Sequence, residues 1–180
     1  GKYDIKFLAR ENVSGKMGTY QTKFVVPDLT AETRFLPISS VVLSSQRMDM
    51  SSAVFSAQRD KRLEAANPLI EDGKKLIPSV TRVFNKNQDM YVYLQAYEPA
   101  AENTEPLVAT VSFIRGKVKT FETAPLQVTA GLDAKSKALP LKFDVPLGKL
   151  VPGKYTCQVN VFNPSAQKFA FWRREVMVVQ

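Results

Sequence analysis

The fold is decided by residues 151–179, which read VPGKYTCQVNVFNPSAQKFAFWRREVMVV. A Pro152-Gly153 turn opens the stretch, and apolar side chains then alternate with polar ones from Tyr155 onward. Turn residues at 163–165 interrupt the alternation, which resumes from Lys168 to Val179. Because successive side chains of a β-strand point to opposite faces, this pattern predicts two antiparallel strands joined by a short turn.

The same alternation occurs along most of the chain. Residues 90–97 and 139–145 form clear strand patterns, and residues 107–123 predict a hairpin that turns at Gly116. Further strands are predicted at 3–9, 20–26, 38–45 and 79–85, with a short strand at 51–57 and a helical turn or two at 59–66. No helical crossover of the kind that a parallel sheet needs is visible. We therefore predict an all-β fold, an antiparallel immunoglobulin-like β-sandwich with an additional N-terminal β-hairpin, and a barrel is the lesser alternative.

The beginning of the chain repeats the pattern of its end. Residues 2–26 align without a gap to residues 154–178, with identities at Lys2, Tyr3, Lys16 and Val26. We therefore predict that residues 1–36 are a β-hairpin and linker that end a preceding sandwich module, and that residues 37–180 are the immunoglobulin-like sandwich. The alternative is that the hairpin adds two strands to one larger sandwich.

An isolated hairpin is marginally stable in water, so the hairpin is expected to pack against something. Its partner is either the rest of the chain or a second copy, which makes a homo-oligomer through the N-terminal hairpin possible. The first residue is Gly rather than Met, so we expect a fragment or a processed product, with any targeting signal outside it.

Composition excludes several kinds of chemistry. The chain has no histidine, which removes the usual general base, the usual zinc ligand and every Ser-His or Cys-His nucleophile. The single cysteine, Cys157, lies on a strand pattern and is expected to be buried and inert. We assign no catalytic, metal-binding or cofactor-binding residue, expect no cofactor, and predict that the protein is not an enzyme.

The net charge of +8 is spread along the chain without a run of five basic residues. A solvated basic surface is the simpler interpretation, and binding to a polyanion is the alternative, so nucleic acid is not the expected partner. No stretch approaches the roughly 20 apolar residues of a membrane helix, and no membrane insertion is expected.

Two groups of aromatic residues are candidates for binding. Tyr91, Tyr93 and Tyr97 alternate along one predicted strand face, which either fills the core or stacks on sugar rings as a carbohydrate-binding module would. The second group is Trp172 with Arg173 and Arg174. If Phe169 and Phe171 fill the core, Trp172 faces solvent and forms with the two arginines an aromatic and basic patch, a composition typical of protein interfaces.

Four stretches together resemble a known family. They read YDIKFLARENVSGKMGTYQTKFVVPDL from Tyr3, LPISSVVLSSQ from Leu36, the segments NPL and LIPSVTRVFNKNQDMYVYLQAYEP from Asn67 and Leu76, and the closing stretch from Val151. Nearly the whole chain is similar to the C-terminal β-rich region of von Willebrand factor A-related proteins of Acidobacteria. The Asp-x-Ser-x-Ser motif of the adhesion domain is not in this chain, so no metal ligand is carried over.

The resemblance implies an accessory module behind an adhesion-type von Willebrand A domain, in an exported protein of the periplasm or the extracellular space. The leading functional prediction is a non-enzymatic interaction module with a protein partner. A carbohydrate-binding module for a polysaccharide is the alternative, and a polyanion binder is the third possibility.

Overall fold

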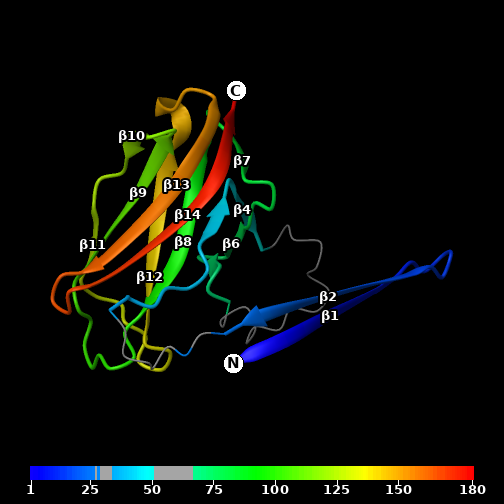
Figure 1. Ribbon diagram of the computed structural model, residues 1–180, viewed down its shortest axis with the longest axis horizontal. Helices are drawn as coiled ribbons and strands as arrows, with labels where there is room; N and C mark the ends of the chain where they lie inside the picture. Colours follow the sequence, from blue (N-terminus) through cyan, green and yellow to red (C-terminus); the bar gives the residue numbers. More distant parts are fainter. Residues whose placement is uncertain (27, 29–33, 51–66) are drawn as a thin grey trace. The chain divides into compact units, whose positions relative to one another are not determined.

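The computed structural model describes residues 1–26, 28, 34–50 and 67–180, and its long elements are all β-strands (Figure 1). Strands form where polar and apolar side chains alternate, because one face can then be buried while the other meets water. The chain is all-β with several antiparallel sheets, which confirms the predicted fold class at this level. The strand predicted at 51–57 and the helical turns predicted at 59–66 lie outside the described residues.

The chain divides into two units, residues 1–32 and residues 33–180. In the first unit, β1 (Lys2–Arg10) pairs antiparallel with β2 (Met17–Val25). In the second unit, Leu36 is buried in the core, so this unit includes the last residue of the predicted linker.

The largest sheet of the second unit contains the strands that end the chain. Its order is β10 (Val118–Glu122), β9 (Leu107–Arg115), β13 (Gly153–Asn163), β14 (Lys168–Val179) and β7 (Val83–Asn85). Neighbours are antiparallel except that β7 runs parallel to β14, and β11 (Leu126–Val128) also pairs with β9. Gly116, which has a φ of 63°, forms the β9–β10 turn in the left-handed region that glycine adopts without strain.

A second sheet supplies the other half of the sandwich-like arrangement. Its order is β12 (Ala138–Pro146), β8 (Asp89–Tyr97) and β3 (Val42–Ser44), all antiparallel. A single 3₁₀ turn, Leu147–Lys149, follows β12. A strand was predicted at 38–45, but the observed strand β3 is shorter, and only an isolated bridge at Ile38 precedes it.

A third, small sheet consists of β4 (Gln46–Asp49), β6 (Lys74–Ile77) and β5 (Ile70–Glu71). The chain passes from the second sheet to this one at Ser44, whose buried hydroxyl donates to the carbonyl oxygen of Ile77 and accepts from the backbone N–H of Gln46. Two ion pairs join the small sheet to β12, Arg47 with Asp144 and Glu71 with Lys142. The small sheet therefore lies over the outer side of the second sheet.

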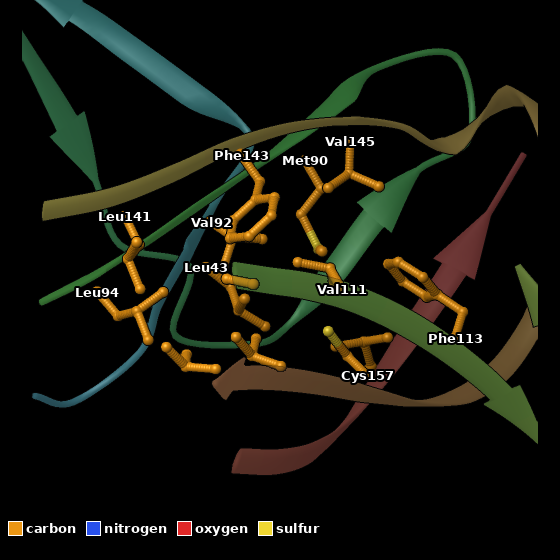
Figure 2. Close-up of a cluster of buried hydrophobic side chains, with 14 of the residues drawn as sticks. Leu43, Met90, Val92, Leu94, Val111, Phe113, Leu141, Phe143, Val145 and Cys157 are labelled. Atoms are coloured by element: carbon orange, nitrogen blue, oxygen red, sulfur yellow. The ribbon is translucent and has the colours of Figure 1, made fainter. Parts of the chain in front are cut away.

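The core lies between the large sheet and the second sheet, and Figure 2 shows side chains of both meeting there. Met90, Val92 and Leu94 on β8 are at most 1% exposed, as are Val111 and Phe113 on β9. Tyr155 links the turn before β13 to this core, because its hydroxyl donates to the carbonyl oxygen of Val151 at 2.5 Å.

Candidate interaction surface

The outer face of the large sheet exposes a group of phenylalanines, which we call the aromatic face: Phe35, Phe162, Phe169 and Phe171. Between 40% and 57% of the surface of each of these residues is exposed. Phe162 on β13 lies directly opposite Phe169 on β14, so both point to the same side of the sheet. The rings of Phe35 and Phe169 meet edge to face, with their centroids 5.3 Å apart. The register of β13 and β14 therefore gathers these rings at one end of the sheet.

A chain of hydrogen bonds, which we call the polar ladder, runs across the same face beside these rings. Arg173 Nε donates to Gln158 Oε1 at 2.5 Å, and Gln158 Nε2 donates to Asn160 Oδ1 at 2.5 Å. Asn160 Nδ2 then donates to Thr110 Oγ1 on β9 at 3.2 Å. The ladder holds polar side chains of three neighbouring strands in fixed positions, so little of their rotamer freedom is left to lose on binding.

The aromatic face and the polar ladder meet at Phe171. It lies opposite Asn160, and the guanidinium carbon of Arg173 is 5.6 Å from the centre of its ring. Exposed aromatic rings beside an arginine and ordered amides have the composition of a protein interface, where such residues contribute most of the binding energy.

The residues of the predicted basic patch do not lie on one face. Trp172 is half-buried and packs against the core, whereas Phe169 and Phe171, which were expected inside, are exposed. The prediction of an exposed Trp172 was therefore wrong, because the buried Val176 and Val178 on the same strand set the even-numbered residues inward. Arg173 lies outside with Phe171, while the Arg174 guanidinium is near the Trp172 ring, 5.8 Å from its centre.

The predicted tyrosine stripe is covered rather than open. Tyr93 is only 7% exposed, and Tyr91 and Tyr97 are half-buried. The guanidinium of Arg47, on the small sheet, stacks over the Tyr91 ring at 4.0 Å. Tyr91 and Tyr93 therefore do not form the flat, solvent-facing platform that sugar stacking needs, because the small sheet lies above them.

A groove of about 240 Å³ remains between the small sheet and the outer side of β8 and β12. Tyr91 and Tyr93 line it together with Leu69 and Leu76, and its charged residues include the Arg47 and Lys142 that form the ion pairs described above. Burial raises the pKa of the Tyr93 hydroxyl above its ordinary value. Arg47 and Lys142 already have carboxylate partners, and these ion pairs join the two sheets across the groove.

A buried polar cluster lies at the end of the sandwich where β13 stops. The side-chain amide of Asn163 donates to Glu98 Oε1 at 2.7 Å and to Glu105 Oε2 at 2.6 Å. Its Oδ1 accepts from the backbone N–H of Ala166 at 2.9 Å. Asn163 thus ties the acidic loop between β8 and β9 to the β13–β14 turn.

Metal-binding and membrane-spanning features were also sought in the described part of the chain. Within residues 1–26, 28, 34–50 and 67–180, no group of three or more His, Cys, Asp or Glu could hold a metal ion. In the same residues, no helix is long and apolar enough to cross a membrane.

Cys157 is buried at the centre of the core, as predicted (Figure 2). Burial raises the pKa of its thiol to about 12, so the thiolate fraction at pH 8 is on the order of 10⁻⁴. We expect a disulfide reagent to leave the native protein unlabelled over an hour at pH 8 and to label it fully in 6 M guanidinium chloride, measured by intact mass. Labelling of the native protein at the denatured rate would contradict this environment.

No family model matches the sequence, and no curated protein matches it. The relationship to von Willebrand factor A-related proteins therefore stays a prediction.

Proposed function

We propose that residues 33–180 are an immunoglobulin-like, non-enzymatic interaction module that binds a folded protein partner through the outer face of the large sheet. The observation that carries the proposal is the exposed aromatic face beside the polar ladder. Monomeric proteins rarely leave such a contiguous aromatic surface open unless it meets a partner.

The order of the strands supports the immunoglobulin-like assignment. A three-stranded sheet, β12–β8–β3, faces a larger sheet in which β9, β13 and β14 are neighbours. In the immunoglobulin arrangement the corresponding strands are E, B and A in one sheet and C, F and G in the other. Strand β10 then takes the place of C′, the strand that variable-type domains add beside C.

A tyrosine corner also supports the assignment. In immunoglobulin-like domains a tyrosine near the start of strand F, two residues before a cysteine, hydrogen-bonds to backbone a few residues upstream. Tyr155 stands two residues before Cys157 at the start of β13, and its hydroxyl donates to the carbonyl oxygen of Val151. The disulfide common in antibody domains has no counterpart, because the chain has one cysteine.

The location in the cell rests on the family resemblance. We propose that the module belongs to an exported bacterial protein, in which it acts as an accessory domain with an adhesion role. The lack of a reactive thiol supports the non-enzymatic part of the proposal, since Cys157 is fully buried.

The proposal is tested by placing a photo-crosslinking amino acid at Phe171 and, in a second protein, at Met48, which is similarly exposed but lies on the small sheet. Extracts of the source organism are irradiated with each protein, and the partner is identified as the protein captured from Phe171 and not from Met48. Equal capture from both positions would contradict the proposal.

Affinity for that partner is then measured with alanine variants. The double variant Phe169→Ala/Phe171→Ala is expected to weaken binding by about 2–3 kcal/mol, roughly 30- to 150-fold, because buried aromatic anchors dominate interfaces of this kind. Met48→Ala serves as the control and is expected to leave the dissociation constant within about threefold, since isolated exposed side chains contribute little. A double variant that binds as tightly as the unmodified protein would refute the proposed surface.

A further inference from the structure

The two hairpins of the chain share one register. Tyr3 lies opposite Phe24 in the β1–β2 pair, and 152 positions later Tyr155 lies opposite Val176 in the β13–β14 pair. The same offset relates every β1–β2 pair to a β13–β14 pair along the ladder. The similarity first seen in the sequence therefore extends to the way the strands are paired.

The turns of the two hairpins are also built alike. In the first, the Glu11 carboxylate accepts from the backbone N–H three residues later, and in the second the Asn163 side-chain oxygen does the same. Each turn ends on a residue with positive φ, 70° at Gly15 and 54° at Gln167. Glu11 and Asn163 are 152 positions apart, as are Gly15 and Gln167. An equal register and an equal turn make the first hairpin the structural counterpart of the last.

This correspondence identifies the inner face of the first hairpin. In β13 the odd-numbered residues from Tyr155 to Val161 are buried in the core. Their counterparts and cross-strand neighbours in the first hairpin form a face rich in aromatic residues: Tyr3, Ile5, Phe7, Tyr20 and Phe24. Within it, Tyr3 stacks on Phe24 at 5.5 Å between centroids, and Phe7 meets Tyr20 at 6.2 Å.

The charges of the two strands lie on the opposite face. On this opposite face lie all the ionisable side chains of β1 and β2 other than tyrosine: Lys2, Asp4, Lys6, Arg10 and Lys23. The aromatic face carries no charge, so it matches an apolar surface such as the inside of a sandwich. Yet Tyr3, Phe7 and Tyr20 are 54%, 57% and 63% exposed.

We propose that β1 and β2 are the closing hairpin of a second sandwich of the same kind, and that apolar strands of that sandwich cover the aromatic face. Those strands belong to the polypeptide upstream of Gly1 in the full-length protein. A second copy of residues 33–180 is not the occupant, because its own closing hairpin already covers the strands that would be needed. Met90 and Leu94, for example, are 0% exposed.

The test compares the 180-residue chain with a natural chain extended upstream by about 100–120 residues, the size of one sandwich. Hydrogen–deuterium exchange is measured by mass spectrometry. In the 180-residue chain, the amides of β1 and β2 are expected to exchange within seconds, because a lone hairpin is marginally stable. In the extended chain, we expect them to exchange at least about 100-fold more slowly, since core strands open only rarely.

Two variants of the extended chain, at adjacent residues on opposite faces of β1, test which face is covered. Phe7→Lys is expected to abolish the slow exchange of β1 and β2, whereas Leu8→Lys is expected to retain it, because Leu8 lies on the charged face. Exchange of β13 and β14 should be unchanged in both variants, which separates this proposal from binding at the outer sheet face.

Several outcomes would overturn the proposal. Equal exchange of the hairpin in the short and extended chains is one, and equal sensitivity to Phe7→Lys and Leu8→Lys is another. If the hairpin amides of the 180-residue chain exchange slowly, and their exchange rate falls further as the protein concentration rises, the face is covered by a second copy instead. A reading frame with no strand-forming sequence upstream of Gly1 would also refute it.

Discussion

Replacement of Phe113 by alanine is expected to lower the free energy of unfolding of residues 33–180 by about 3–5 kcal/mol. The side chain is 0% exposed and belongs to the hydrophobic core between the two sheets. Its ring contacts Phe121 on β10 and Tyr155 on β13, with centroids 6.1 and 6.2 Å away. Truncation removes these contacts and leaves a cavity that neighbouring strands, held by their backbone hydrogen bonds, fill only in part.

The measurement is urea-induced unfolding followed by the fluorescence of Trp172, the single tryptophan, whose half-buried ring reports on this unit. Phe162→Ala is the matched control, because it makes the same truncation on the outer face of the same sheet, where the side chain is 47% exposed. The control is expected to cost less than about 1 kcal/mol, since little area is lost to water. Equal costs for the two variants would contradict the assignment of inner and outer faces.

Replacement of Asn163 by leucine is expected to destabilise the second unit by about 3–5 kcal/mol, because Glu98, which is only 6% exposed, loses its hydrogen-bond donor inside the protein. Leucine has a similar size, so the cost arises from the uncompensated carboxylate rather than from a cavity. Thermal or urea unfolding at pH 7 gives the value.

Asn160→Leu is the control for this prediction, since it removes the same amide from the same strand where the partners are uncharged. Its expected cost is about 1 kcal/mol. In the background of Asn163→Leu, a second change, Glu98→Gln, is expected to recover about 1–2 kcal/mol, because the buried charge is gone. If Asn163→Leu costs no more than Asn160→Leu, or if Glu98→Gln brings no recovery, the carboxylate is not the source of the loss.

The strands of the sandwich could be predicted because their alternation is strong and local. Residues 90–97 and 139–145 were predicted as strands and occur in β8 and β12, which extend by one residue at the start of β8 and at each end of β12. The long β13 and β14 were likewise predicted, since a Pro-Gly turn and a short polar turn bound them. Such signals depend on neighbouring residues and not on distant contacts.

The candidate surface was predicted less well, because β14 has bulky apolar residues on both faces. Phe169 and Phe171 look as apolar as Val176 and Val178, and only the pairing with β13 decides which pair is inside. That pairing could in principle have been predicted from the sequence. Cys157 and Val159 set the inner face of β13, Phe162 has the opposite phase, and the short turn places Phe169 opposite Phe162.

The covering of the tyrosine stripe could not be predicted from local pattern. The small sheet that covers it has strands of two to four residues, with lysines in β6 and an arginine in β4, so no alternation reveals them. Its position depends on contacts between residues far apart in the sequence, such as Arg47 with Asp144 and Tyr91.

The place of β14 between two neighbours has a mechanical consequence. Strand β13 holds it along one side, and β7 holds its last residues on the other, where Lys86 N–H donates to the carbonyl oxygen of Val179 at 2.8 Å. A pull on Gln180 along the strand axis therefore loads the bonds of both ladders in shear at the same moment, instead of peeling them apart one by one. A force applied at this terminus would meet high resistance.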